Sequence, residues 1–357
     1  MKIKDFIDYE QPNEYIVESD RYSSKYSTPV LTAGHSFILG YINENNGIYK
    51  KGPCIIFDDF TTSVHYVDFP FKVKSSAMKI LTAKSNADLK YCYYLLLSLS
   101  NMPPNHKRQW ISTTSEKNHL LPSIDKQISI VKQLDLISGT IANYTNQIEN
   151  LNNLVKARFI ELFGTVRENP YKYPTATLKE VCHKITDGKH GGCEQEENSG
   201  YYYIGAREIY DGEIHYDTAP QIKYTDFSKD YRRCNIEQGD MVIVNTGATI
   251  GKSAIASSSL TERTLLQKSV ALIKVKPNII SAEFLRYCYM ANPSMYMVES
   301  ASAQPNLLLS KINTTVIYLP PMDLQLQFAD FVQQVDKSKL AVQQSLEKTQ
   351  LLFDSLM

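Results

Sequence analysis

Residues 124–163 contain no proline and a single glycine. Apolar side chains recur along this stretch in alternating steps of three and four, which is the heptad pattern of a coiled-coil seam. Pro122 and Asp125 suit the start of a helix, and Gly164 with Asn169-Pro170 suits its end. The predicted seam of this helix comprises Leu134, Ile137, Ile141, Tyr144, Ile148, Leu151 and Val155.

A second stretch, residues 322–357, repeats this pattern. Its seam positions 332, 335, 342, 346 and 353 each lie 198 positions after a seam residue of the first stretch, so the two seams share their register. Lys339 and Thr349 interrupt the second seam with polar side chains, which can fix the register of a coiled coil. The predicted apolar seam of this helix comprises Phe328, Val332, Val335, Val342, Leu346, Phe353 and Leu356.

Helices of about 35 residues are roughly 50 Å long, at about 1.5 Å per residue. Such a helix cannot bury its apolar stripe against one small domain and needs an equally long partner, which this chain supplies. We therefore predict an intramolecular, antiparallel coiled coil with a β-rich unit at each end, the two units being related by a pseudo-twofold axis. The alternative is a pair of separate helical appendages within a larger assembly.

Short sequence words recur in the same order in the two halves of the chain, with offsets of 196 and 198 for the two clearest pairs. Chance similarity is the alternative, and four matches in one order argue against it. Each half thus consists of a β-rich segment, a short helix, a Leu-Pro boundary and a long helix. The matched words are Leu89-Lys-Tyr-Cys-Tyr93 with Leu285-Arg-Tyr-Cys-Tyr289, Leu121-Pro-Ser-Ile-Asp-Lys-Gln127 with Leu319-Pro-Pro-Met-Asp-Leu-Gln325, Gly52-Pro-Cys-Ile-Ile56 with Gly239-Asp-Met-Val-Ile243, and Ser76-Ala-Met-Lys-Ile80 with Ser269-Val-Ala-Leu-Ile273.

The segments outside the long helices are rich in strand and turn signals, such as the apolar runs 54–57, 241–244 and 270–275. The predicted fold class is α+β, with two small mixed α/β domains separated by two long antiparallel coiled-coil helices. Strand order does not follow from the pattern, because the period-2 alternation is imperfect. The predicted boundaries place a first domain at 1–121, a central helix at 122–165, a second domain at 166–318 and a C-terminal helix at 319–357.

Composition narrows the class of protein. The 357 residues carry 38 Lys and Arg and 38 Asp and Glu, so any nucleic-acid contact must come from local basic patches rather than from a global field. The six cysteines include no C-x-x-C pair, which disfavours a zinc ribbon, and they are too sparse for a disulfide-stapled fold. No apolar run approaches the length of a membrane span, and the first residues carry acids where a signal peptide would have an apolar core. We therefore expect a reduced, cytoplasmic protein without such a span.

Catalytic motifs are scarce. Gly247-Ala-Thr-Ile-Gly-Lys-Ser253 is similar to a phosphate-binding loop, but only three residues separate its glycines where that loop needs four. Asp58-Asp59 are paired acids without a basic partner at catalytic spacing, and the seven histidines show no metal-ligand spacing. No dinucleotide-binding motif, nucleophile elbow or zinc-protease motif occurs. The sequence therefore predicts a binding protein with no catalytic residues, no metal and no cofactor of its own.

Clusters of basic and amide side chains are the stronger signal. Arg and Lys recognise phosphates and guanine, and Asn and Gln recognise adenine in the major groove. Each such residue taken alone is more often a solvated surface residue. The candidate DNA-binding residues are Lys107, Arg108 and Gln109 in the first half, and Lys189, His190, Arg207, Asn245, Thr246, Lys252, Arg263 and Gln267 in the second.

Over nearly its full length the chain resembles the specificity subunits of type I restriction–modification systems. One departure is Lys189, where members of that family often carry a neutral residue. The resemblance rests on Thr28-Pro-Val-Leu-Thr-Ala-Gly-His-Ser-Phe-Ile-Leu-Gly-Tyr41, Ile55-Ile-Phe-Asp-Asp-Phe-Thr-Thr62, Val67-Asp-Phe-Pro-Phe-Lys-Val-Lys-Ser-Ser-Ala-Met-Lys79, Glu161-Leu-Phe-Gly164, Ile185-Thr-Asp-Gly-Lys-His-Gly191, Gly247-Ala-Thr-Ile-Gly-Lys252, Gln304-Pro-Asn-Leu307 and the two Leu-Pro-x-x-Asp-x-Gln words.

The resemblance implies two target-recognition domains, each reading one half of a split site in double-stranded DNA. It implies that the helix pair fixes the unread spacer and docks two methyltransferase subunits. Cleavage and translocation would belong to separate restriction subunits, and S-adenosylmethionine, ATP and Mg would be bound by these partners. Because the two β-rich units differ in sequence, we expect an asymmetric, bipartite target.

Two other hypotheses stay open from the sequence. One is an enzyme, either a nucleotide-binding protein or a methyltransferase, with degenerate motifs. The other is a coiled-coil scaffold without a DNA role, whose behaviour on DNA would not depend on salt.

Overall fold

The computed structural model describes residues 1–32, 36–100, 107–165, 168–292, 295 and 307–357. The chain forms two compact units, one of Met1–Thr145 with Gln344–Met357 (unit 1) and one of Asn146–Gln343 (unit 2). Each unit thus contains one β-rich part and one end of each long helix. The domain boundaries given above stay a prediction, because these units divide within the helices.

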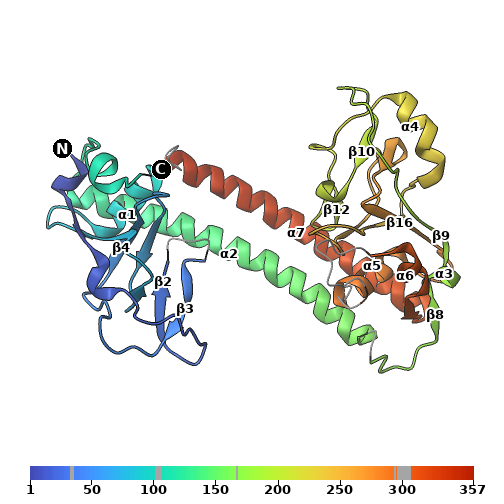
Figure 1. The fold of residues 1–357 in the computed structure, drawn as a ribbon, viewed down its shortest axis with the longest axis horizontal. Helices are drawn as coiled ribbons and strands as arrows, with labels where there is room; N and C mark the ends of the chain where they lie inside the picture. Colours follow the sequence, from blue (N-terminus) through green and yellow to red (C-terminus); the bar gives the residue numbers. More distant parts are fainter. Residues whose placement is uncertain (33–35, 101–106, 166–167, 293–294, 296–306) are drawn as a thin grey trace. The chain divides into compact units, whose positions relative to one another are not determined.

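The two predicted long helices are present as α2 (Ile124–Phe163) and α7 (Met322–Leu356), of 40 and 35 residues (Figure 1). Each has an Asp in its first turn, at the positive end of the helix dipole. Gly164 ends α2 with a φ of +70°, a conformation that favours glycine, and its amide donates to the carbonyl of Ile160 at 2.7 Å. The α+β class and both long helices are therefore confirmed.

Within each unit the two helices run antiparallel. In unit 2 the last turns of α2 pack on the first turns of α7, where the rings of Phe159 and Phe163 lie 5.4 and 5.6 Å from that of Phe328. In unit 1 the first half of α2 shares a cluster with Phe353 of α7 and with Met357, which follows the helix. Because the C-terminal end of one helix meets the N-terminal end of the other, the direction follows from these contacts alone.

Burial along the predicted seam is uneven. Phe159 and Phe163 extend the seam of α2 beyond Val155, where the sequence analysis ended it, and both are fully buried. Burial is deepest at the ends of the helices because the short helices pack there as well. Leu134, Val155, Val332 and Val335 are buried, and Ile137, Ile141, Tyr144, Ile148, Leu151, Val342, Leu346 and Phe353 are half-buried.

Unit 1 contains a four-stranded antiparallel sheet in the order β1-β7-β4-β5. One face of the sheet packs on the short helix α1 (Leu89–Ser98), and the other faces a three-stranded sheet in the order β3-β2-β6, in which β2 and β6 are parallel. The strands are β1 (Ile7–Glu10), β2 (Thr28–Leu31), β3 (Ile38–Ile42), β4 (Cys54–Asp58), β5 (Val64–Val67), β6 (Lys72–Val73) and β7 (Met78–Ala83).

Unit 2 contains a second four-stranded antiparallel sheet in the order β14-β13-β16-β9, with a parallel pair of β10 and β15 beside it. One face of the sheet packs on α5 (Ala282–Ala291) and on the long helices. The strands are β8 (Thr175–Thr177), β9 (Cys182–Asp187), β10 (Tyr202–Ile204), β11 (Ile209–Tyr210), β12 (Glu213–Ile214), β13 (Met241–Val244), β14 (Ser253–Ile255), β15 (Thr264–Leu266), β16 (Val270–Val275) and β17 (Val316–Tyr318), and the remaining α-helices are α3 (Leu178–Val181), α4 (Tyr224–Asp230) and α6 (Leu309–Thr314).

The two sheets have the same topology. In the order of each sheet, β1, β7, β4 and β5 correspond to β9, β16, β13 and β14, and the parallel pair of β2 and β6 corresponds to β10 and β15. The short helices α1 and α5 each follow the strand that they cover, β7 and β16. The internal repeat found in the sequence is therefore a repeat of the fold.

The match between the short helices is the one most shifted in the structure. The helix cap of α1 is Asp88, which accepts the amide of Tyr91, and the cap of α5 is Ser281, which accepts the amide of Phe284. Ser281 lies 193 positions after Asp88, whereas the matched Leu-x-Tyr-Cys-Tyr words lie 196 apart. An alignment of the two helices on these words is therefore displaced by three residues, nearly one helical turn, from the alignment of their caps. A short apolar word fits a helix face at more than one register, and the cap determines the register here.

A buried glutamine fastens each short helix to its long helix. Gln127 is fully buried, and its Oε1 accepts the amide of Asp88 at 2.8 Å. Its Nε2 donates to the carbonyl of Pro122 at 2.8 Å and to that of Asn86 at 3.3 Å. One side chain thus satisfies backbone groups at the starts of both helices.

Gln325 makes the same bonds in unit 2. It is fully buried, accepts the amide of Ser281 at 2.9 Å, and donates to the carbonyl of Pro320 at 2.8 Å. This explains the Gln of both Leu-Pro-x-x-Asp-x-Gln words in physical terms. A shorter side chain leaves buried backbone groups without partners.

We predict that Gln127→Ala and Gln325→Ala each lower the free energy of unfolding by about 2–3 kcal/mol, since each leaves buried polar groups unpaired. Urea unfolding followed by circular dichroism measures this. Gln133→Ala and Gln327→Ala are matched controls, because both residues are exposed on the same two helices. Equal stability of the buried and exposed variants would contradict the role of the two glutamines.

Candidate nucleic-acid interface

In unit 2, the strands β9, β10, β13, β15 and β16 end or begin at one edge. Val244 at the end of β13 pairs with Val270 at the start of β16, and Asp187 at the end of β9 pairs with Ala271. The parallel strands β10 and β15 also end beside each other, and the chain then runs from β15 into β16. The loops 188–192, 205–207, 245–252 and 267–269 therefore gather at this edge, which we name the unit 2 loop edge.

Backbone hydrogen bonds fix these loops to one another. A Cβ at Gly188 would lie 2.2 Å from the carbonyl oxygen of Leu266, so the loop after β9 passes too close for any other residue. The loop edge is thus a built surface on which side chains have defined positions. The bonds run from the amide of Gly188 to the carbonyl of Val270 (3.1 Å), Lys189 to Leu266 (2.7 Å), Lys268 to Lys189 (3.0 Å), Asn245 to Ser269 (2.9 Å) and Gln267 to Ile204 (2.8 Å).

The loop that is similar to a phosphate-binding loop is a turn between two strands. It joins β13 to the antiparallel β14, and the amide of Gly251 donates to the carbonyl of Val244 at 2.9 Å. Gly247 and Gly251 have φ of +99° and +89°, so the glycines serve this turn. A nucleotide-binding loop joins a strand to a helix whose N-terminus receives the phosphate. The structure therefore gives no support to nucleotide binding at this loop.

The structure brings most of the second-half candidates together at the unit 2 loop edge. Arg263 is the exception, because it precedes β15 and lies at the opposite end of that strand. Arg207 and Lys252 are exposed, whereas Asn245 is only 5% exposed and accepts a hydrogen bond from Thr246, which favours a positioning role for its side chain. The candidates at the edge are Lys189, His190, Arg207, Asn245, Thr246, Lys252 and Gln267.

Acidic neighbours hold two of these candidates in place. Lys189 forms an ion pair with Asp230, and this hydrogen bond raises the pKa of Lys189. His190 and Arg233 both bind Asp187, at 2.7 and 2.6 Å. Burial alone would raise the pKa of Asp187, but these bonds keep it below its ordinary value. The edge therefore carries ordered side chains that can exchange a carboxylate for a phosphate.

In unit 1 the candidate Gln109 is buried and acts on the backbone. The backbone amide of Gln109 donates to the carbonyl of Asp59 at 2.8 Å. Its side-chain amide donates to the carbonyl of Lys107, also at 2.8 Å. Lys107 and Arg108 are exposed. Gln109 therefore shapes the segment that presents these two cations. The neighbouring residues 101–106 lie outside the described residues, as do 33–35 and 304–306 of the family words.

Asp59 is a residue whose role the sequence analysis missed. Its carboxylate accepts the amide of Trp110 at 2.8 Å and lies 2.9 Å from the ammonium group of Lys79, with both side chains almost fully buried. The expectation that Asp58-Asp59 lack a basic partner was wrong for Asp59. Lys79 is distant from Asp59 in the sequence, and only the pairing of β4 with β7 brings it close.

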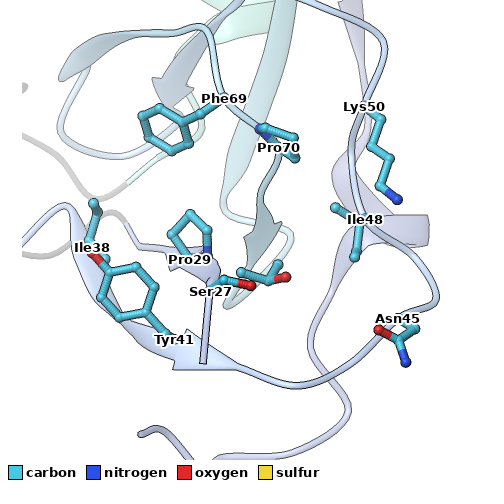
Figure 2. A pocket seen from close by; sticks show the side chains of 10 residues that line it. Ser27, Pro29, Ile38, Tyr41, Asn45, Ile48, Lys50, Phe69 and Pro70 are labelled. Atoms are coloured by element: carbon cyan, nitrogen blue, oxygen red, sulfur yellow. The ribbon is translucent and has the colours of Figure 1, made fainter. Parts of the chain in front are cut away.

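A hollow of about 570 Å³ lies on unit 1 (Figure 2). Figure 2 shows Ile38, Tyr41 and Phe69 around it, with Lys50 near its rim. It borders the start of β2, whereas the strand end that corresponds to the unit 2 loop edge is at Leu31. None of the predicted DNA-binding residues lines it.

In the described part of the chain, no group of His, Cys, Asp or Glu side chains is placed to hold a metal, and no helix has the length and apolar character of a membrane span.

Comparison with known families agrees with this arrangement. Residues 170–351, which include the unit 2 loop edge and most of α7, match the family described as type I restriction modification DNA specificity domain. The chain belongs to this family. The specificity-domain match covers half of the chain and does not include the β-rich part of unit 1.

Individual relatives extend the likeness. A segment of 153 residues is 46% identical to the type I restriction enzyme EcoR124I/EcoR124II specificity subunit of Escherichia coli, covering 39% of this chain and 38% of that protein. The matched segment thus spans well under half of that relative's length. A specificity (S) subunit structure from M. genitalium aligns over 100% of this chain and 94% of its own, with a TM-score of 0.60 and 16% identity. A type I restriction–modification structure on complex assembly and conformational transition aligns over 98% and 96%, with a TM-score of 0.54 and 15% identity. At these identities the likeness concerns the fold.

We predict that Arg207→Ala and Lys252→Ala weaken binding to duplex DNA. Each substitution is expected to make the negative slope of log affinity against log salt concentration shallower by about 0.9, which is the contribution of one phosphate contact. Fluorescence anisotropy at several salt concentrations measures the slope. Lys179→Ala is the control, because Lys179 is exposed on α3, at the opposite end of β9 from the loop edge. Slopes that match this control would remove both residues from the interface.

Proposed function

We propose that this chain is the non-catalytic DNA-recognition subunit of a type I restriction–modification complex. In this proposal each unit reads one half of a split target in double-stranded DNA. The observation that carries it is the duplicated sheet, with a loop edge at the same place in each unit, in a chain of the specificity-domain family. A protein with two reading edges on one chain is suited to a two-part target.

The target is expected to be asymmetric because the corresponding positions differ in chemistry. The turn after β13 carries Asn245, Thr246 and Lys252, whereas the turn after β4 carries Asp59 and Thr61. Side chains with different donors and acceptors select different bases. Two identical half-sites would need two identical edges, which this chain lacks.

The helix pair is proposed to dock two methyltransferase subunits, with restriction subunits joining the complex through them. Docking needs apolar surface that the chain itself leaves uncovered. S-adenosylmethionine, ATP and Mg would be bound by these partners, and the complex would work in the cytoplasm. Exposed apolar side chains on the two helices are Ile124, Ile128, Leu136, Leu154, Ile160, Leu326, Leu340, Leu351, Leu352 and Leu356.

The rival hypotheses are less well supported. An enzyme of nucleotide chemistry would need a loop that leads into a helix, and the strand-to-strand turn at Gly247 and Gly251 does not provide one. A scaffold without a DNA role leaves the ordered, cation-bearing loop edge without a purpose. Turnover of S-adenosylmethionine or ATP by the purified chain alone would favour the enzyme.

Methylome sequencing of a host with and without this chain tests the proposed function. The expected result is loss of methylation at one split, asymmetric motif when the chain is removed. Arg207→Ala with Lys252→Ala is expected to weaken methylation at that motif, whereas Lys179→Ala leaves it unchanged. Methylation of one contiguous palindrome that depends on this chain would contradict the two-part target.

The proposed spacer role of the helices has its own test. One heptad added to both α2 and α7 lengthens the pair by about 10 Å, or roughly 3 base pairs of DNA. The unread spacer of the methylated motif is expected to grow by that amount while both half-sites stay the same. A spacer of unchanged length in a folded, active variant would show that the helices do not set it.

A further inference from the structure

The backbone bonds of the unit 2 loop edge recur in unit 1. In unit 2 the amide of Gln267, just after β15, donates to the carbonyl of Ile204 at the end of β10, at 2.8 Å. In unit 1 the amide of Lys74, just after β6, donates to the carbonyl of Leu31 at the end of β2, at 2.9 Å. Lys74 therefore occupies the structural position of Gln267.

A second pair of bonds supports this correspondence independently. The amide of Asn245 donates to Ser269 at 2.9 Å, and the amide of Asp59 donates to Ala77 at 3.0 Å. In each unit the next strand of the sheet begins directly after Ser269 or Ala77. The two units thus correspond also at the residue after β4 or β13 and at the residue before β7 or β16.

A third pair places the basic segment of unit 1. The amide of Leu307 donates to the carbonyl of Asn245 at 2.7 Å, just as the amide of Gln109 donates to the carbonyl of Asp59 at 2.8 Å. The exposed cations Lys107 and Arg108 directly precede Gln109. They therefore belong to the same edge of unit 1 as Lys74.

Lys74 is available for an anion. Its side chain is 37% exposed and pairs with the carboxylate of Asp20, which is 75% exposed. An ion pair this open to solvent contributes little to stability, so a phosphate can replace the carboxylate at small cost. The ring of Tyr22 lies 5.9 Å from the ammonium group and limits where it can point.

We propose that Lys74 is a DNA-phosphate contact of unit 1, at the position that Gln267 occupies in unit 2, and that Asp20 holds its ammonium group when DNA is not bound. This inference rests on the proposed function and names the recognition edge of the unit that the family match does not cover. Lys74 orients unit 1 on the duplex and does not itself select a base.

The test uses the chain assembled with its methyltransferase subunits and a duplex that carries the motif from the methylome. Lys74→Ala is expected to weaken binding about 8-fold at 0.1 M salt. It is also expected to make the negative slope of log affinity against log salt concentration shallower by about 0.9, which is the loss of one phosphate contact. Asp20→Asn removes the competing carboxylate and is expected to keep or raise the affinity. A merely structural ion pair would make both substitutions act in the same direction.

Lys84→Ala is the matched control. Lys84 is 35% exposed and pairs with the exposed Asp8 at 3.3 Å, but it follows the far end of β7, away from the edge. It is expected to keep the affinity and slope of the unsubstituted complex. Thermal unfolding of each variant checks that folding is unchanged.

The outcomes separate the two proposals. If the unsubstituted complex binds DNA with a strong salt dependence and Lys74→Ala behaves like Lys84→Ala, the assignment of Lys74 is wrong and the proposed function stands. If the unsubstituted complex shows no salt-dependent binding to any duplex, the proposed function itself is wrong.

Discussion

The structure depends on apolar contacts that join the ends of the two long helices to each other and to the short helix of each unit. In unit 2 the buried rings of Phe159, Phe163 and Phe328 meet, and each contributes about 1.5–3 kcal/mol relative to exposure. In unit 1 the ring of Phe353 lies 6.2 Å from that of Tyr94, although 259 positions separate them. Unit 1 is therefore incomplete until the last turns of the chain are made.

The two halves of the chain share the hydrogen bonds that hold the backbone and differ in their exposed side chains. Gln127 and Gln325 satisfy the same backbone groups, and the same hydrogen bonds recur at both loop edges. At one shared position the side chains are nevertheless Lys74 and Gln267. A scaffold held by main-chain bonds tolerates such changes, because the exposed side chains contribute little to its stability. Under the proposed function, this is the physical basis on which two halves of one fold would recognise different DNA.

Periodicity made the long helices predictable, since a heptad seam sustained over many turns has few alternative folds. The strands 54–58, 241–244 and 270–275 could also be anticipated from apolar runs, but their order could not, because pairing depends on partners far along the chain. The same limit applies to the site. The cluster of Lys189, Asn245 and Gln267 forms only when strands that are distant in the sequence pair, and the buried partner of Asp59 was invisible for that reason.

Burial divides the candidate residues by role. Gln109 and Asn245 were selected as amides that could read adenine, yet both are buried. The side chain of Gln109 donates to the carbonyl of Lys107, and that of Asn245 accepts the hydroxyl of Thr246. Arg207, Lys252, Lys107 and Arg108 are exposed and can reach an anion. The chain has no net charge, and fields fade within about 10 Å at 0.1 M salt, so the proposed attraction to DNA depends on where such cations stand on an ordered edge. In that proposal the buried Gln109 acts indirectly, because its side chain shapes the segment that carries Lys107 and Arg108.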